Sequence, residues 1–242
     1  MYKLYAMNDF RIETLSGEKD TEKLQKYMTD IYDLHCQTIG APPYDCPITM
    51  KQMTKKAMRS LTLGAVVLLY YKEQVVGYMG GEIGVPDHQL VEIGVRDFGL
   101  PRETTAVPLG IFIDRKFQGV KLSKVLTNIL YRFFARHGYA HIIGPTKQAG
   151  DQYKYYEPLG YNMSYASYDL ELYADPKRIL YGDIKTILEK TKDFSTIAAW
   201  DQQRKISRML KLFGRTSHEE RRNSTKSSAP TTSLAWGEMI YT

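Results

Sequence analysis

The chain has 242 residues and a net charge of +6, and its 43% hydrophobic and 12% aromatic content is typical of a globular protein with a sizeable core. It has no apolar run of about 18 residues and no basic-then-apolar leader, so we expect neither a membrane span nor a signal peptide. The two cysteines, Cys36 and Cys46, favour a reducing, cytoplasmic location over a disulfide scaffold. No ligand spacing of zinc type accompanies them, so no metal site is predicted.

Apolar residues in the first part of the chain alternate between helical and strand periods. Leu24, Ile31 and Leu34 recur at helical spacing, whereas short apolar runs follow after residue 64. The predicted elements are a strand at Phe10–Leu15, a helix from Asp20 or Thr21 to about Thr38, a cationic helix at Thr49–Leu61, and a hairpin of strands Ala65–Tyr71 and Val75–Ile83. This alternation favours mixed α/β layers.

The middle of the chain predicts a strand, a turn, a helix and a second strand in about fifty residues. Pro86–Thr105, an insertion or an irregular hairpin, precedes them. The predicted order is a strand at Val107–Ile113, a turn at Asp114–Ser123, a helix from about Ser123 to His137, and a short buried strand at Tyr139–Gly144. Gly138 lies where a left-handed helix cap is expected.

The turn at Asp114–Ser123 has the chemistry of a phosphate cradle. Where a turn opens a helix, several backbone N–H groups lack intrahelical acceptors, and the helix dipole is positive there. Such a site binds phosphate or pyrophosphate, and Gly119 allows close approach of the ligand to the backbone. A Gln-Gly pair in a turn of this kind is also common as a purely structural feature, so both interpretations remain open.

Two motifs in this region resemble those of the GNAT N-acetyltransferase superfamily. The family's acyl-coenzyme A motif is written Gln/Arg-x-x-Gly-x-Gly/Ala, and Asp114–Leu126 resembles it. Gln118 falls on its first position, Lys121 on its first Gly and Ser123 on its Gly/Ala, so that Lys121 and Ser123 are departures. Tyr155–Tyr161 is similar to the Phe-Tyr-x-x-x-Gly-Phe signature that closes the same core. The resemblance covers roughly residues 10–173.

The resemblance implies a fold and a co-substrate. The expected fold is α/β, with a mixed, mostly antiparallel central sheet flanked by helices. The expected co-substrate is acetyl-CoA or another acyl-CoA, and no metal is implied. The family splays its strands where the pantetheine arm binds. The residues implied in coenzyme binding are Ile111, Phe112 and Ile113 for the arm, and Gln118, Gly119, Val120, Lys121, Leu122 and Ser123 for the pyrophosphate.

The chemistry requires a group that removes a proton from the amine and a group that protonates the thiolate. Alkylamines have a pKa of about 10.4, so a carboxylate or an ordered water must deprotonate them. The resemblance places Tyr156 at the family's acid position, although both Tyr155 and Tyr156 can equally be packing residues. Glu82 and Glu92 are the candidate bases. His141 lies on an apolar strand and is expected in the core.

The C-terminal part carries the net charge. Between Arg204 and Lys226 there are eight basic and two acidic residues, so the remainder of the chain is balanced. Asp175-Pro176 predicts the start of a helix. Further along, apolar residues recur at helical spacing from Ile206, which predicts an amphipathic helix with an apolar stripe. The expected domains are therefore residues 1–174, the GNAT-like acyltransferase domain, and 175–242, a helical basic extension with a flexible linker. The stripe packs on the core, or the helix contacts nucleic acid, an anionic membrane or an acidic partner.

Three functional hypotheses follow. The favoured one is an N-acyltransferase that moves an acyl group, most simply acetyl, from acyl-CoA to a primary amine of a small molecule or protein. The second is an acyl-CoA-binding or regulatory module that has lost catalysis through its altered turn. The third is an acyltransferase directed to nucleic acid by the basic tail. The loops at Gly40–Pro47 and Pro86–Thr105 would select the acceptor, and they carry no motif that identifies it. Acyl chain length and oligomeric state also remain open.

Overall fold

The computed structural model describes residues 7–42, 47–84, 99–147, 156–165 and 177–206. Two compact units are distinguished, Met1–Asp201 and Gln202–Thr242. In the second unit the described residues are 202–206, and they are helical. In the described part of the chain, no helix has the length and apolar character that crossing a bilayer requires.

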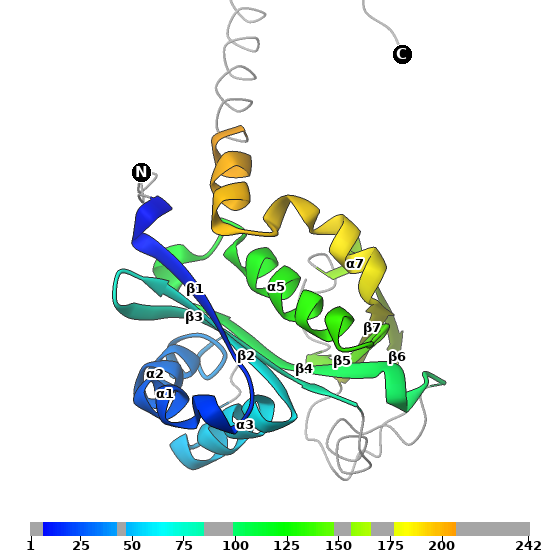
Figure 1. Ribbon diagram of the computed structural model, residues 1–242, viewed down its shortest axis with the longest axis horizontal. Helices are drawn as coiled ribbons and strands as arrows, with labels where there is room; N and C mark the ends of the chain where they lie inside the picture. Colours follow the sequence, from blue (N-terminus) through cyan, green and yellow to red (C-terminus); the bar gives the residue numbers. More distant parts are fainter. Residues whose placement is uncertain (1–6, 43–46, 85–98, 148–155, 166–176, 207–242) are drawn as a thin grey trace, which may run out of the picture. The chain divides into compact units, whose positions relative to one another are not determined.

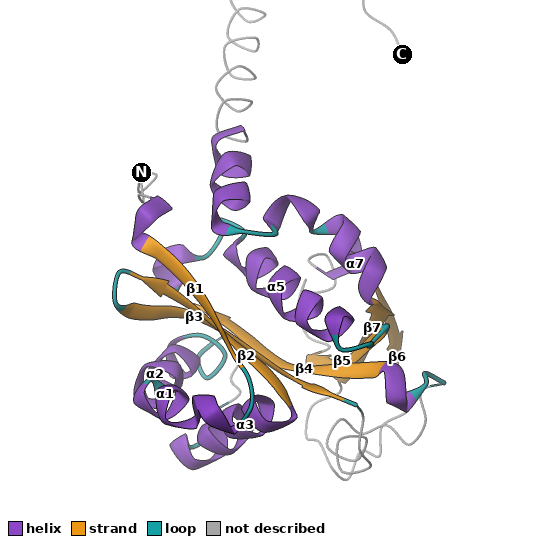
Figure 2. Ribbon diagram, viewed as in Figure 1, coloured by secondary structure: helices purple, strands orange, loops and turns teal. Residues whose placement is uncertain are grey.

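The first unit is built on one seven-stranded sheet with the order β1-β2-β3-β4-β5-β7-β6 (Figures 1 and 2). Every neighbouring pair is antiparallel except β4 and β5, which run parallel. The mixed, mostly antiparallel sheet predicted from the sequence is thus confirmed. The strands are β1 Phe10–Leu15, β2 Gly64–Tyr71, β3 Gln74–Ile83, β4 Thr105–Ile113, β5 His141–Lys147, β6 Tyr161–Tyr165 and β7 Lys177–Asp183.

Helices cover both faces of the sheet, as Figure 1 shows. On one face lie α1 Thr21–Lys26, α2 Met28–Gln37 and α3 Met50–Leu63; on the other lie α5 Leu122–Arg136 and α7 Ile184–Lys190. Each face has its own apolar core. Leu24, Ile31 and Leu61 pack against β2 and β3 on the first face, and Leu126, Leu130 and other α5 side chains pack on the second. Burying these two apolar stripes is the main force that holds the layers together.

Most element boundaries follow the sequence pattern closely. The strand at Phe10–Leu15 has the bounds that were predicted. The helix expected from Asp20 or Thr21 to Thr38 is instead two helices, because the backbone at Tyr27 leaves the helical region at φ −102° and ψ 6°. The predicted strand at Tyr139–Gly144 begins two residues later, at His141. Gly138 has the left-handed φ of 84° that its position requires.

The helix predicted from Asp175-Pro176 is wrong, because residues 177–183 form strand β7, which pairs with both β5 and β6. Ile179 and Leu180 are both buried, as expected for a strand inside a covered sheet. Their apolar run joins the helical pattern of Ile184 and Ile187, and this produced one apparent helix. The sheet and the first compact unit therefore extend beyond the boundary expected after residue 174.

Three short 3₁₀ helices frame the site described below. They are η4 Arg115–Phe117, which follows β4; η5 Glu157–Leu159, which precedes β6; and η6 Lys192–Phe194, which follows α7. Residues 197–201 at the end of the first unit are helical as well.

Candidate functional site

Strands β4 and β5 exchange hydrogen bonds over a very short length. Their parallel ladder contains two residue pairs, Thr105 with His141 and Ala106 with Ile142. Two positions further along β4 lies Pro108, which has no N–H group to continue a ladder. Beyond these two pairs, β4 continues to pair with β3 on its other side, and β5 continues to pair with β7. The two central strands thus stop pairing in the middle of the sheet, the place where the resemblance implies a splay.

A bulge lies at the same place in β4. Gly80 pairs with Gly110, and Gly81 pairs with Pro108, so Leu109 is an extra residue on β4. Gly110 has a φ of 137°, a conformation that side chains strongly disfavour. Residues 108–111 are half-exposed, whereas both ends of this strand are buried. A central strand with an exposed middle offers main-chain groups to a ligand.

The loop after β4 leaves amide groups for a ligand. In the described part of the chain, no protein acceptor is recorded for the N–H groups of Gly119, Val120 and Lys121. Gly119 has a φ of 79° and open space where a Cβ would be. The loop is held from within, because Gln118 Nε2 donates to Ile113 O at 2.9 Å. These amides stand at the positive end of the 15-residue helix α5.

Lys121, which the resemblance aligns with the motif's first Gly, has a left-handed backbone, with φ 66° and ψ 19°. Glycine adopts this conformation without strain, whereas a residue with a side chain does so at a cost. The exposed side chain of Lys121 reaches toward η6, with Nζ 5.9 Å from the centre of the Phe194 ring. Lys124 Nζ lies 5.2 Å from the same ring. Burial, with a smaller effect from Lys121, lowers the pKa of Lys124.

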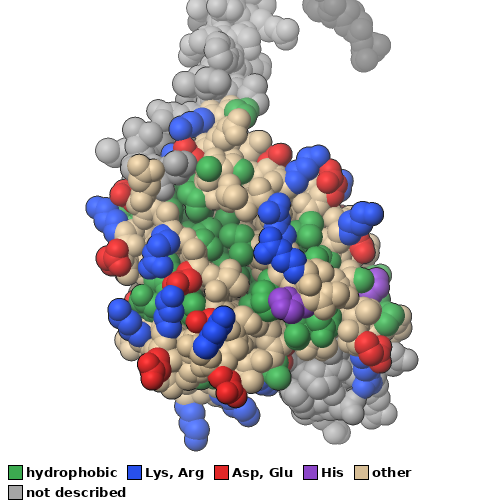
Figure 3. Space-filling view, in the orientation of Figure 1, with side chains coloured by type: hydrophobic (Ala, Val, Ile, Leu, Met, Phe, Trp, Pro, Cys, Tyr) green, Lys and Arg blue, Asp and Glu red, His purple; other side chains and the backbone are tan. Residues whose placement is uncertain are grey.

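Cationic side chains gather over α5 on the face shown in Figure 3. Lys121 and Lys124 contribute two positive charges beside the loop, and no ion pair is recorded for either within the described residues. The exposed amides and these lysines together give the start of α5 a positive potential, which suits a diphosphate.

Tyr156 directly precedes η5, and its side chain is half-buried. Its ring meets the Tyr161 ring edge-on, with centroids 5.2 Å apart, and packs against the core under α5. The ring is thus held in place, and it is not sealed from solvent. Tyr155 lies outside the described residues.

Glu82, one of the two candidate bases, lies within β3 and is fully buried. Arg59 from α3 donates from Nε to Glu82 Oε1 at 2.6 Å. Burial, and to a lesser degree the Glu82 charge, raise the pKa of the Tyr78 hydroxyl well above its ordinary value. Neither Arg59 nor Tyr78 stood out in the sequence, since each lies within an ordinary helix or strand pattern.

The other candidate residues are distributed as follows. Glu92 lies outside the described residues. His141 is half-buried at the start of β5 and therefore not in the core as expected. The Phe112 and Ile113 side chains are buried on opposite faces, against the first and the second core respectively. Any contact of these two residues with a ligand would therefore be through the backbone, where Ile113 O already accepts from Gln118.

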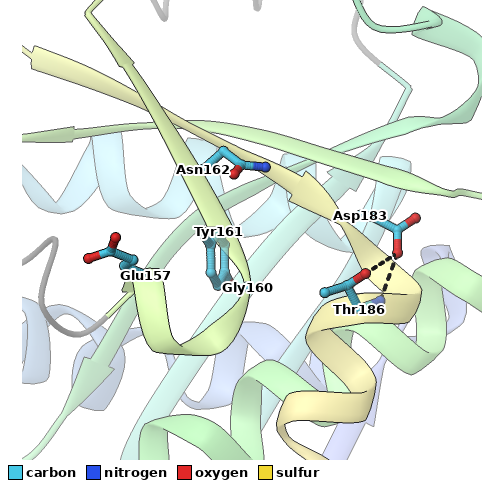
Figure 4. A pocket seen from close by; sticks show the side chains of 6 residues that line it. All are labelled: Glu157, Gly160, Tyr161, Asn162, Asp183 and Thr186. Carbon is cyan, nitrogen blue, oxygen red and sulfur yellow. Dashed lines mark hydrogen bonds between the residues drawn. The ribbon is translucent and has the colours of Figure 1, made fainter.

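A shallow hollow lies at the other edge of the sheet, beside β6 and α7 (Figure 4). Asp183 and Thr186 line it, but they are engaged with each other: the Asp183 carboxylate accepts from Thr186 N at 2.7 Å and from Thr186 Oγ1 at 2.8 Å. Burial acts to raise the pKa of Asp183, and the hydrogen bonds from Thr186 outweigh it, so the pKa is lowered. The carboxylate caps α7, and the hollow contains none of the predicted site residues.

No protein-family model and no curated protein matches the chain. Solved structures do match it. The PaiA N-acetyltransferase from Thermoplasma acidophilum, solved in complex with coenzyme A, has a TM-score of 0.51 at 8% identity over 72% of this chain and 98% of its own. Ard1 from Thermoplasma volcanium has a TM-score of 0.50 at 11% identity, over 72% and 97%. A GNAT-family acetyltransferase from Listeria monocytogenes has a TM-score of 0.50 at 13% identity, over 72% and 94%.

At such low sequence identities, these structural matches show a shared fold and nothing more. The chain has the fold of the GNAT N-acetyltransferase superfamily.

Proposed function

We propose that the protein is an N-acyltransferase that moves an acyl group, most simply acetyl, from acyl-CoA to a primary amine by direct attack. Two separate main-chain sites carry this proposal: the half-exposed middle of β4, which is unpaired toward β5, and the amides of Gly119–Lys121, for which no protein acceptor is recorded in the described part of the chain. A long ligand with an amide-containing arm and a diphosphate matches these two sites. The PaiA structure with coenzyme A supports the choice of donor.

Backbone groups near Ile111 would bind the pantetheine arm, because this part of β4 is half-exposed and unpaired toward β5. Gln118–Ser123 would hold the pyrophosphate with their amides and the helix dipole. Gln118 acts indirectly, since its side-chain amide is bonded to Ile113 O and so fixes the loop to the strand. Gly119, the next residue, has open space on its Cβ side.

In the reaction the amine nitrogen attacks the thioester carbonyl carbon, a C–N bond forms and the C–S bond breaks. The amine loses a proton to a base, and the departing thiolate takes one from an acid. Tyr156 is our candidate acid, because a phenol with a pKa of about 10 is protonated at neutral pH. Its half-buried ring, packed on Tyr161, gives the hydroxyl a fixed direction.

The base is assigned less directly. Glu82 is buried in an ion pair with Arg59, an arrangement better suited to holding α3 on β3 than to exchanging protons with an amine. Glu92 or an ordered water therefore remains our proposal for the base. The acceptor is a small-molecule or protein amine. A nucleic-acid partner bound through the basic tail and a cytoplasmic location also remain proposals.

A coenzyme-binding module without catalysis is the second candidate, favoured by Lys121 at the place of the family's Gly. Calorimetry with acetyl-CoA and a thiol-release assay with a panel of amines separate the two. An enzyme binds acetyl-CoA and releases CoA thiol in an amine-dependent manner, whereas a module binds without turnover. Failure of the full-length protein to bind acetyl-CoA at all contradicts both.

A further inference from the structure

The loop before α5 rests on a cluster of aromatic rings from distant parts of the chain. Phe117 of η4 is buried and anchors the loop in this cluster. The Phe10 ring lies 5.7 Å from the Phe117 ring and 5.3 Å from the Trp200 ring, both edge-on. Tyr71 completes the cluster, 5.1 Å from both Phe10 and Phe117. The C-terminal segment of the first unit thus forms part of the support of the loop.

Trp200 also bonds directly to the loop backbone. Its indole Nε1–H donates to Val120 O at 2.6 Å, and the residue is 1% exposed. Val120 O and the N–H of Lys121 belong to one planar trans peptide, in which they point in opposite directions. Holding the carbonyl toward Trp200 therefore turns the Lys121 N–H away from the core, to the side where a ligand can reach it.

The segment that carries Trp200 is fixed to α5 by a buried hydrogen-bond pair. Asn128 Nδ2 donates to Thr191 Oγ1 at 2.8 Å and to Thr191 O at 3.1 Å. Three residues after Thr191, the Phe194 ring lies within reach of both Lys121 and Lys124. Thr191, Phe194 and Trp200 thus each contact α5 or the loop before it.

We infer that Trp200 is a positioning residue of the coenzyme site, one that orients the Val120–Lys121 peptide for the pyrophosphate. The inference rests on the proposed function. Without the indole N–H, this peptide can rotate and present its carbonyl oxygen to the phosphates, which repel it. We expect binding of the pantetheine arm to be unaffected. The arm would bind to β4, whereas the Trp200 hydrogen bond is made to Val120, which lies outside that strand.

The test is Trp200→Phe, which keeps an aromatic ring and removes the N–H, measured in the full chain. We expect the Kd of CoA to rise about fivefold, the loss typical of one hydrogen bond. We expect kcat/KM with acetyl-CoA to fall equally, and kcat/KM with S-acetylpantetheine, which lacks the diphosphate, to stay unchanged. Trp236→Phe, at the other tryptophan, is the matched control, and we expect it to change none of these three values.

Equal losses with both donors, or no loss with either, overturn the inference, because only acetyl-CoA has the diphosphate that the Val120–Lys121 peptide would contact. If the wild-type protein binds no CoA, the proposed function is contradicted, and the inference about Trp200 is contradicted with it. A second measurement guards against misfolding of Trp200→Phe. The wild-type chain has two tryptophans and should therefore give two indole N–H signals by NMR, which Trp236→Phe would assign. Saturating CoA should shift the Trp200 signal; an unmoved signal contradicts the inference.

Discussion

Helices α3, α5 and α7 begin in two different ways. Thr49 caps α3 by accepting from Gln52 N at 3.2 Å, and Gln52 Oε1 accepts from Thr49 N in return. Asp183 caps α7 through Thr186. Helix α5 begins at Lys121 without a side-chain cap. A helix start costs stability when its amides are unsatisfied. Helices α1 and α2 also lack a side-chain cap, and at α5 the proposed function assigns the role of the cap to the pyrophosphate.

The largest expected effect comes from placing a carboxylate at the uncapped start. We predict that Lys121→Asp weakens CoA binding about a hundredfold, since it exchanges an attraction for a repulsion within a few ångströms of the diphosphate. Calorimetry measures the change. Lys72→Asp is the matched control, because Lys72 is also a left-handed lysine, in the turn between β2 and β3, with a φ of 56°. A similar loss in both variants would mean that net charge, and not the cradle, is responsible.

Catalysis offers the next test. We predict that Tyr156→Phe lowers kcat at least tenfold with little change in the Kd of CoA, because the ring contact with Tyr161 is kept and only the proton donor is lost. Stopped assays of thiol release give kcat, and calorimetry gives the Kd. Unchanged turnover would remove the acid role and leave Tyr156 as a packing residue.

The conformation of Lys121 gives a smaller effect. Lys121→Gly should raise the free energy of unfolding by about 1 kcal/mol, since a left-handed backbone strains lysine and suits glycine. Lys72→Gly should do the same. Only Lys121→Gly should also weaken CoA binding, by about two- to fivefold, through the loss of one exposed charge. Denaturant unfolding and calorimetry on both variants test this. Tighter CoA binding by Lys121→Gly would show that the lysine obstructs the cradle.

The sequence predicted local features well and distant ones poorly. The helix at Thr49 and the strand at Phe10–Leu15 depend on neighbouring residues, so their patterns identified them. The loop at Gln118–Gly119 was located for the same reason. Strand β7 was missed because its apolar run merges with that of α7, and only pairing with β5 and β6 distinguishes a strand from a helix there. The bond of Trp200 to Val120 joins residues 80 positions apart, which no local pattern reveals.

The smallest effect is expected at the start of α7, which a side chain of the protein caps. In contrast to α5, we expect a change here to affect stability and not CoA binding. Asp183→Ala should lower the free energy of unfolding by about 0.5–1 kcal/mol at neutral pH without changing CoA binding. The pKa of Asp183 is lowered in the folded protein, below its ordinary value of about 3.9. Its stabilising effect is therefore complete above about pH 4 and declines as the pH falls through the lowered pKa. Unfolding of both proteins between about pH 2 and 7 should show the difference shrinking only at the acid end. A difference that persists undiminished at pH 2 would show that the charge of the carboxylate contributes nothing to the cap.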